Sequence, residues 1–417
     1  MRLIFFVMNR VSFIRDRFAE FYEENASKIE APSSISQREF GFFTFKENIV
    51  IRHKGFITAE ALRDFIKKIV PSHAYYSAAY YEMPEEPMEK KGWLGADLYF
   101  DIDADHIPTE CGKIHDTWVC RDCGFQGKGV APEECPACGS KRFEEQKWPC
   151  EVCLESAKYE AIKLLDFLIE DFGFSPSEIK VSFSGHRGYH VQVESEKIRD
   201  LDSTARKEIV DYVTGVGLEP TYHGLQGSPR GARVTSGPNL DEAGWRGRIA
   251  RGTHEFLLSA TREDLEELNL RKKVIDEILS KREEILRSWE KRGPWGLIKG
   301  VGVETWKKII MRAIESQSAR IDTVVTTDVH RLIRLPNTLH GKTGWLKVSF
   351  PADEIEKFDP LSSAIAFKKG EITIYVKEAP KFRIGEETFG PFEDRKVELP
   401  MAAAMFLLCK DAAEVVD

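Results

Sequence analysis

The chain has 417 residues, of which 42% are hydrophobic, so it is long enough for two or three domains and can bury a sizeable core. Its net charge of -8 argues against a protein that coats nucleic acid in general, because phosphate backbones favour a basic face. The apolar run at residues 3–8 is too short to span a membrane, and no small-residue cleavage site follows it. We therefore expect an intracellular, cytoplasmic protein with no membrane partner.

The first half of the chain alternates between strand and helix patterns. Helical spacing of apolar residues predicts a helix over residues 13–22 and a second helix that contains Ala161 and Leu168 and ends near Gly173. Strands are predicted at 98–103, 179–183 and 190–193, and at 40–51 as a pair around 46–48. This order predicts an α/β (α+β) core.

The second half begins with a helical pattern. Leu, Ile, Lys, Arg and Glu recur at helical spacing from residue 261 to 318, interrupted by glycines near 293 and 300. Strand-like residues return at 323–325, 346–350 and 372–376, and residues 400–416 predict a closing helix. The expected domains are a core built from 1–105 and 154–225, an inserted module at 106–153, a helical subdomain at 226–320, and the rest of the core at 321–417.

The strand at 98–103 carries two aspartates on one side. Alternation puts Phe100 and Ile102 on one face and Asp101 and Asp103 on the other. Residues two apart in a strand are separated by about 6.6 Å, so the two carboxylates can share hard divalent cations. Paired cations of that kind stabilise the attacking and leaving oxygens in phosphoryl transfer. A solvated strand face is the alternative interpretation.

A loop with the sequence Ser-Gly-His-Arg-Gly-Tyr-His, residues 184–190, joins the next two strands. Its two glycines allow a tight turn. Ser184 and the loop amides can donate to phosphate oxygens, Arg187 can bind phosphate bidentately, and His190 can add a donor. The loop therefore suits a polyphosphate, with a plain polar hairpin as the alternative.

The segment 331–344 contains Gly-Lys-Thr, which suggests a P-loop. Pro336 stands where the first glycine of that motif belongs, so we reject a P-loop. What remains is a basic cluster with aspartates upstream as candidate further metal ligands: Arg334, His340 and Lys342, with Asp322 and Asp328. An ordinary strand and turn with solvated charges is the alternative.

Seven of the eight cysteines lie between residues 111 and 153, and CxxC pairs in a chain without a signal peptide favour metal over disulfides. Two CxxCG knuckles predict a tetrathiolate zinc site made of Cys120, Cys123, Cys135 and Cys138. A second tetrahedral set is predicted from Cys111, His115, Cys150 and Cys153, with His106 as a rival for His115 and buried free thiols as the alternative. Both sites would be closed and structural.

A Gly-rich segment between residues 224 and 252 offers the best candidates for holding a nucleic-acid template. They are Arg230, Arg233, Arg246, Arg248 and Arg251. A solvated loop surface is the alternative.

Taken together and in this order, the motifs resemble the archaeal and eukaryotic primase small-subunit family over nearly the whole chain. Residues 100–103 match the family's first metal motif, residues 184–190 match its triphosphate motif, and residues 331–344 resemble its late basic motif. Residues 38–40 with 51–52 are similar to its early strand motif. The inserted CxxCG pair departs from the family, because it enlarges the usual single zinc site.

The resemblance implies a primase catalytic core with an inserted zinc-binding module. Two Mg2+ or Mn2+ ions would be held by Asp101, Asp103 and Asp322, and the nucleoside triphosphate would be contacted by Ser184, Arg187, His190, Arg334 and His340. Asp322 is preferred to Asp328 because it stands where the family's third aspartate falls relative to His340.

The same resemblance implies a DNA-directed nucleotidyltransferase that makes short RNA or DNA primers on single-stranded DNA by two-metal transfer. The expected partner is a large primase subunit that carries an iron-sulfur domain. One alternative is a repair or end-joining polymerase of the same superfamily, which extends primers without starting chains. Another is a noncatalytic zinc-ribbon subunit, which would bind nucleic acid without incorporating nucleotides.

Overall fold

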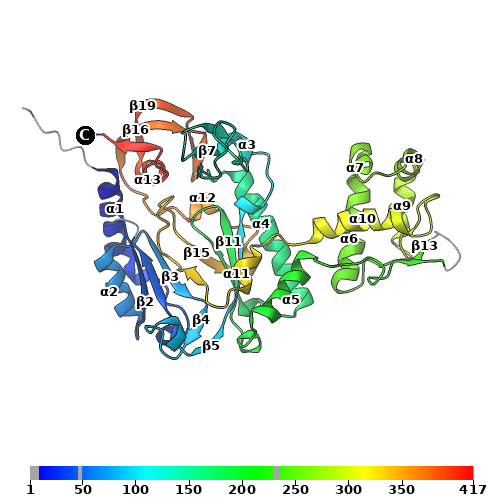
Figure 1. The fold of residues 1–417 in the computed structure, drawn as a ribbon, viewed down its shortest axis with the longest axis horizontal. Coiled ribbons are helices and arrows are strands. Elements are labelled where there is room, and N and C mark those ends of the chain that lie inside the picture. The colour runs from blue at the N-terminus through cyan, green and yellow to red at the C-terminus, as the bar shows by residue number, and fades with distance from the viewer. Residues whose placement is uncertain (1–8, 46–48, 229–233, 417) are drawn as a thin grey trace, which may run out of the picture. The chain divides into compact units, whose positions relative to one another are not determined.

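The structure, a computed structural model, describes residues 9–45, 49–228 and 234–416 (Figure 1). The chain divides into two compact units. The first comprises Met1–Ile162, Ser175–Lys207 and Ile321–Asp417, and the second comprises Lys163–Phe174 and Glu208–Arg320. The first unit therefore collects three separate stretches of sequence, and all the predicted metal-binding and triphosphate-binding residues belong to it.

One sheet of the first unit has the strand order β14-β3-β1-β2, and all its neighbours are antiparallel. Its strands are β1 (Phe40–Phe43), β2 (Val50–Lys54), β3 (His73–Ser77) and β14 (Leu332–Arg334), and the helices of this part of the chain are α1 (Arg10–Asn25) and α2 (Ala59–Ile69). Phe13, Phe18 and Tyr22 form the buried face of α1. These findings confirm the predicted helix and strand pair, while residues 46–48 lie outside the described part.

A second sheet has the order β15-β10-β11-β6 and is also antiparallel throughout. Its strands are β6 (Leu98–Asp103), β10 (Ile179–Phe183), β11 (Gly188–Val193) and β15 (Val348–Pro351). Leu98, Phe100, Val181 and Val191 are fully buried in its core. The strands predicted from alternation are confirmed, and β14 was not predicted. A short pair, β4 (Ala79–Tyr81) with β5 (Trp93–Ala96), lies nearby in the chain.

The end of the chain forms a third sheet and a helix. Its strands are β16 (Glu371–Ala379), β19 (Phe392–Pro400) and β20 (Ala413–Val415), beside the hairpin β17 (Phe382–Ile384) and β18 (Glu387–Phe389), and its helices are α12 (Pro360–Ser363) and α13 (Met401–Cys409). The predicted helix over 400–416 is therefore wrong beyond Cys409. Residues 413–415 extend instead because their backbone pairs with β16.

The strand predicted at 323–325 is also wrong, because these residues begin helix α11 (Thr323–Thr327). The side chain of Asp322 caps this helix by accepting hydrogen bonds from the backbone N–H groups of Val324 and Val325. The cap outweighs the weak strand preference of a short β-branched run.

The cysteine-rich insertion contains α3 (Gly112–His115) and a three-stranded sheet of β7 (Thr117–Cys120), β8 (Gln126–Lys128) and β9 (Phe143–Gln146). Helix α4 (Glu151–Asp166) follows and continues as a π-helical turn at Phe167–Asp171. Gly173 then adopts a φ of 71°, a backbone conformation that favours glycine and ends the helix as predicted.

The second unit is mainly helical in its described residues. Its helices are α6 (Gly244–Ser259), α7 (Arg262–Glu267), α8 (Lys272–Ser280), α9 (Arg282–Ser288) and α10 (Val303–Gln317), with the strand pair β12 (Gln226–Gly227) and β13 (Val234–Ser236); α5 (Ser203–Thr214) precedes them. Trp245, Ile249 and Trp306 are buried. The boundaries expected for a separate subdomain stay a prediction. Among the described helices, none is long and apolar enough to cross a membrane.

One of the five arginines that the sequence suggested for holding a template does not lie at the surface. Arg248 is buried and pairs with Asp171 at 2.9 Å, so that part of the prediction is wrong. Arg246 pairs with Glu242. Arg230 and Arg233 lie outside the described residues.

Candidate active site and metal centres

The aspartates of β6 face the triphosphate loop across a strand pair. In the register of β6 with β11, Asp101 lies opposite His190 and Asp103 lies opposite Gly188. Both carboxylates are half-buried, while Phe100 and Ile102 are fully buried, as alternation predicted. Asp101 Oδ1 and His190 Nε2 are 3.4 Å apart, so the metal motif and the loop motif meet at these two side chains.

Asp322 joins the pair from a distant part of the sequence. Its backbone N–H donates to the carbonyl of Asp101 at 2.8 Å. Burial, followed by the charges of Asp103 and Asp322, raises the pKa of Asp101 to about 7. The three carboxylates therefore share one electrostatic environment, which is the condition under which a cation is most strongly favoured.

Asp328, the alternative third carboxylate, has different surroundings. It accepts a hydrogen bond from the backbone N–H of His330. Its charge helps to raise the pKa of Tyr81, whereas the main influences on the pKa of Asp101 are burial and other charges. Among the described residues, three or more potential metal-ligand atoms lie within 4.8 Å of one another only in the two cysteine sets. The carboxylates of Asp101, Asp103 and Asp322 therefore do not all lie within 4.8 Å of one another.

The loop of residues 184–190 contains a tight turn, and the hydroxyl of Ser184 forms hydrogen bonds within it. Ser184 Oγ accepts from the backbone N–H groups of His186 and Gly188, each at 3.2 Å. A Cβ on Gly188 would lie 2.1 Å from the carbonyl oxygen of Ile102, so only glycine permits this approach of β11 to β6. His190 Nδ1 is buried and has no hydrogen-bond partner among the described residues. That orphaned nitrogen is available to a ligand.

Arg187 is fully buried and points toward the cysteine-rich module. Its guanidinium pairs with Asp105 at 2.9 Å and with Asp116 at 3.2 Å, and it donates to Cys153 Sγ at 3.5 Å. Asp116 in turn pairs with His115 Nδ1 at 2.8 Å. The loop and the metal module are therefore joined through one carboxylate, and contact of Arg187 with a triphosphate stays a prediction.

The late basic segment lies against β3. Arg334 contacts His73 Nδ1 at 2.7 Å and donates to the hydroxyl of Tyr75 at 3.0 Å. His340 stacks on His186 with ring centroids 4.9 Å apart and meets His73 edge-on at 4.8 Å. A row of three imidazoles thus connects the late segment with the triphosphate loop. Burial holds the pKa of all three below the ordinary range, so they are neutral donors or acceptors near pH 7.

Two buried lysines near these motifs were not predicted from the sequence. Lys347 precedes β15 and donates to the carbonyl of Arg334 at 2.7 Å. Burial and the charge of Arg334 lower its pKa to about 7, while Asp101 opposes this shift, which places Lys347 within electrostatic reach of the metal strand. The other is Lys410, at the end of α13. For both residues, the only sign of burial in the sequence was the position of a lysine inside an otherwise apolar stretch.

The first cysteine set has tetrahedral dimensions. The Sγ atoms of Cys120 and Cys138, and those of Cys123 and Cys135, are each 3.6 Å apart. A tetrahedral zinc with bonds of about 2.3 Å requires sulfurs about 3.8 Å apart, far beyond a disulfide. The two knuckles have the same backbone geometry, because the N–H of the following glycine donates to the first cysteine's carbonyl at 2.9 Å in both. These cysteines could hold a metal ion and are compatible with zinc.

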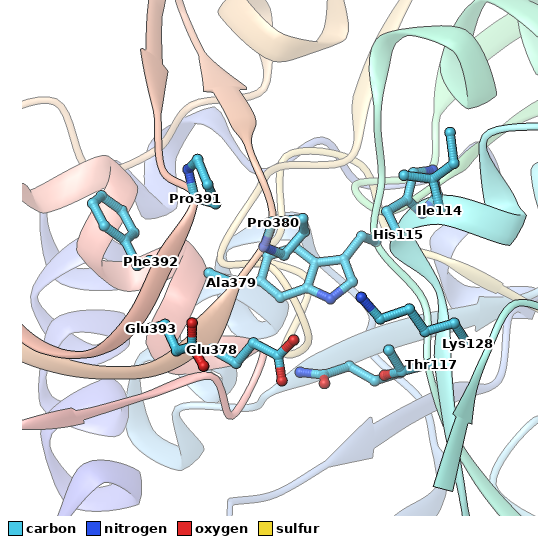
Figure 2. Close-up of a pocket in the computed structure, with 12 residues that line it drawn as sticks. Ile114, His115, Thr117, Lys128, Glu378, Ala379, Pro380, Pro391, Phe392 and Glu393 are labelled. Carbon is cyan, nitrogen blue, oxygen red and sulfur yellow. The ribbon is translucent and has the colours of Figure 1, made fainter.

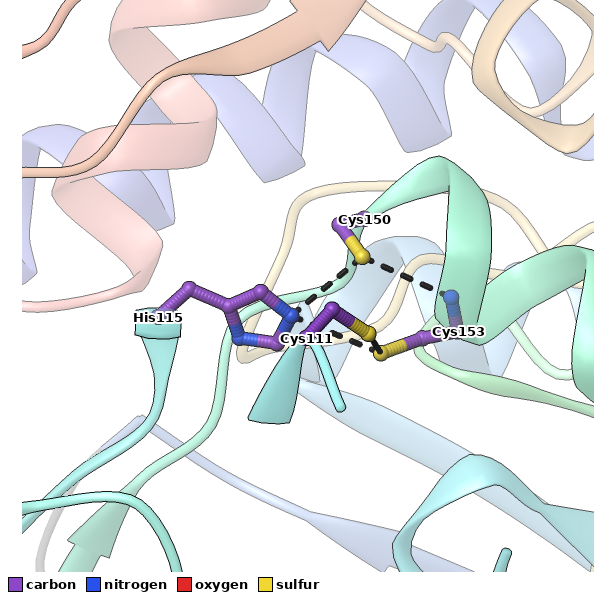
Figure 3. Close-up of side chains that lie close together, drawn as sticks. All are labelled: Cys111, His115, Cys150 and Cys153. Carbon is purple, nitrogen blue, oxygen red and sulfur yellow. Dashed lines mark hydrogen bonds between the residues drawn. The ribbon is translucent and has the colours of Figure 1, made fainter. Parts of the chain in front are cut away.

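The second set gathers three thiols around one imidazole, as Figure 3 shows. Cys111 and Cys153 Sγ are 3.3 Å apart, and His115 Nε2 lies 3.2 Å from Cys150 Sγ and 3.5 Å from Cys153 Sγ. The pairing of His115 Nδ1 with Asp116 is the usual arrangement around a metal-ligating histidine. This set could also hold a metal ion; the side chain of His106 lies outside the described part.

A separate pocket of about 460 Å³ lies between the cysteine-rich module and the third sheet (Figure 2). His115 and Lys128 line one side of it, and Glu378 and Glu393 line the other. Its acidic and basic groups are balanced, and neither Asp101 nor the triphosphate loop borders it. It therefore adds nothing to the candidate active site.

Comparison with known proteins agrees with this combination of fold and site. A family model described as DNA primase small subunit matches residues 144–353. The chain belongs to this family. Among its relatives, the DNA primase small subunit PriS of Methanothrix thermoacetophila is 34% identical over 97% of this chain and 98% of its own, and that of Methanococcoides burtonii is 32% identical over 96% and 97%. The PriS of Nitrosopumilus maritimus is 29% identical over 97% and 98%. The likeness to these relatives therefore extends well beyond residues 144–353.

Proposed function

We propose that the chain is the catalytic subunit of a DNA primase and joins nucleotides into short RNA or DNA primers on a single-stranded DNA template. The observation that carries the proposal is the half-buried Asp101, whose pKa is raised by burial and then by the charges of Asp103 and Asp322, and whose carboxylate faces His190 of the loop at residues 184–190. A carboxylate in that setting is unfavourable without a cation, and the opposing loop is suited to phosphate.

In the proposed reaction, the 3'-hydroxyl of one nucleotide attacks the α-phosphate of the next, so that an O–P bond forms and the bond to pyrophosphate breaks. Asp101, Asp103 and Asp322 would hold two Mg2+ or Mn2+ ions, which supply charge stabilisation for the attacking and leaving oxygens when bound. Asp322 accepts the hydroxyl proton. Ser184, His190, Arg334 and His340 orient the triphosphate.

We infer that both cysteine sets bind Zn2+ as structural ions. Support comes from four protein ligands in each set and sulfur separations close to those of a tetrahedral site. Such closed sites contribute folding energy and leave no open position for catalysis.

The relatives in Methanothrix thermoacetophila and Methanococcoides burtonii are named as small subunits. We therefore propose that this chain acts with a large primase subunit. The net charge of -8 is consistent with a template that is held partly by a partner, since this chain as a whole would repel the phosphate backbone.

Replacing Asp101 with alanine tests the proposal. Asp101→Ala should reduce template-directed incorporation at least about a thousandfold, because it removes a shared cation ligand. The measurement is incorporation of labelled nucleotides on unprimed single-stranded DNA with Mg2+ or Mn2+, with thermal unfolding to show that the fold is intact. Asp353→Ala, which changes an exposed aspartate, is the matched control.

Normal synthesis by Asp101→Ala would overturn the assignment. Wild-type protein that extends a supplied primer but never starts a chain would indicate the repair or end-joining polymerase instead. Template binding without any incorporation would indicate the noncatalytic subunit.

A further inference from the structure

Lys410 is a buried cation outside every sequence motif. It follows α13, whose residues from Ala403 to Leu408 are almost completely buried, and its own exposure is 8%. Its Nζ donates to the carbonyl of Lys147 and lies 3.2 Å from His186 Nε2. A lysine in this position loses hydration, and the two groups at its Nζ are a carbonyl and an imidazole, neither of which carries a negative charge.

The contact with His186 links Lys410 to the proposed triphosphate site. His186 stacks on His340 with the two rings 12° from parallel, and His340 meets His73, which contacts Arg334. The row of imidazoles therefore has Arg334 at one end and Lys410 at the other. Arg334 is a cation and Lys410 becomes one when it is protonated, and the residues between them carry nitrogen donors or acceptors.

The charges around Lys410 repel one another. Burial and then Arg187 and Lys342 lower the pKa of Lys410 to about 7, while Asp105 and Asp116 oppose the shift. Both of these carboxylates already pair with Arg187. Lys410 therefore lies near the cations Arg187 and Lys342, and a phosphate group beside it would favour its protonated form.

An open pocket gives access to this cluster. It has a volume of about 460 Å³ and is lined by Lys410, Lys342, Arg121 and Lys147, by the neutral imidazole of His186, and by Asp105, Glu144 and Glu145. Lys147 pairs with Asp105 and Glu145, so Lys410, Lys342 and Arg121 are the basic side chains left to meet an anion. The pocket has room for phosphate groups, and Lys410 and Lys342 border it from two different segments.

We propose that Lys410, with Lys342 and His186, forms the subsite for the terminal phosphate of the incoming nucleoside triphosphate. The inference rests on the proposed function and deepens it, since it names the group that makes the site select triphosphates over diphosphates. Arg334 and His340 serve the inner phosphates, and Lys410 extends the site beyond them through His186.

Equilibrium binding to the full chain tests the proposal with four ligands: a nucleoside triphosphate, the matching diphosphate, inorganic tripolyphosphate and pyrophosphate, all with Mg2+. Lys410→Met keeps the length of the side chain and removes its charge. We expect triphosphate and tripolyphosphate to bind about 10-fold more weakly, because a charge-assisted contact is lost, and diphosphate and pyrophosphate to change by less than about 2-fold. Lys410→Arg should restore most of the preference, and Lys381→Met, an exposed lysine in the same part of the chain, should leave it unchanged.

Equal weakening of triphosphate and diphosphate would show that Lys410 does not contact the terminal phosphate, and unchanged triphosphate binding would overturn the proposal too. If Lys410→Met fails to fold, Lys410→Gln replaces it: loss of the triphosphate preference in the folded variant supports the subsite, and a preference within about 2-fold of the wild type overturns it. A wild-type protein that incorporates no nucleotide would refute the proposed function. Tripolyphosphate binding would still show whether Lys410 contributes to an anion-binding site.

Discussion

Asp101 occupies a position that disfavours its ionised form. It is half-buried and lies near Asp103 and Asp322, and its pKa is raised to about 7. An acid with a raised pKa in the folded state binds its proton more tightly there than in the unfolded chain, where its pKa is near 3.8. Without divalent cations, stability should therefore fall as pH rises from about 4 to 7, and the full penalty should persist above pH 7.

Asp101→Asn tests this at the scale of one residue. In buffer without added divalent cations and without chelator, so that zinc is retained, we expect the variant to be more stable than the wild type above pH 7 by on the order of 2 kcal/mol. The difference should shrink toward zero below about pH 4, as the wild-type carboxyl becomes protonated in the unfolded state as well as in the folded state. Thermal or denaturant unfolding across this pH range measures it, with Asp353→Asn as control. A variant that is less stable than the wild type at pH 8 would contradict the prediction.

At the scale of elements, short sequence patterns predicted the structure correctly where the repeat of the backbone decides which side chains share a face. The alternation in β6 and the two cysteine knuckles are of this kind, because their ligands lie within a few residues of one another. The predictions for 323–325 and for 413–415 failed for a common reason. In both, a contact outside the local pattern decided the conformation: the cap made by Asp322 and the pairing of β20 with β16.

The zinc-binding module yields a prediction about metal content. The wild-type chain should carry two zinc ions, and Cys123→Ser should carry about one, since the second set shares no ligand with the first. Elemental analysis of purified protein measures this. Cys409→Ser, which changes the cysteine outside both sets, should keep both ions. Two ions retained in Cys123→Ser would contradict a tetrathiolate site.

At the scale of the whole molecule, Asp116 joins parts that are far apart in sequence. Its carboxylate pairs with His115 of the second cysteine set and with Arg187 of the triphosphate loop, and it accepts from the backbone N–H of Trp148. One side chain therefore orients both a candidate metal ligand and the loop. Metal binding and nucleotide binding should be coupled through it, and such coupling is reciprocal.

Asp116→Asn should weaken this coupling. We expect the second zinc to transfer to a chelator about 10-fold more readily, and KM for nucleotide to rise several-fold with a smaller change in kcat. Adding nucleotide should slow zinc loss in the wild type and have less effect in the variant. Asp122→Asn, whose carboxylate pairs with Arg142 in the first knuckle, is the control and should leave KM unchanged. If nucleotide does not change the rate of zinc loss from the wild-type protein, the two sites are not coupled.

The sequence by itself determined the local groups of this protein: two carboxylates on one face of a strand, a glycine-containing loop, and two sets of side chains that could hold a metal ion. These follow from the strand period, from glycine's backbone freedom and from CxxC spacing. Only the tertiary structure decided that Asp322 lies against Asp101, that Arg187 is held by Asp116, and that Lys347 and Lys410 are buried beside the site. Long-range strand pairing and packing create these contacts, and no local periodicity encodes them.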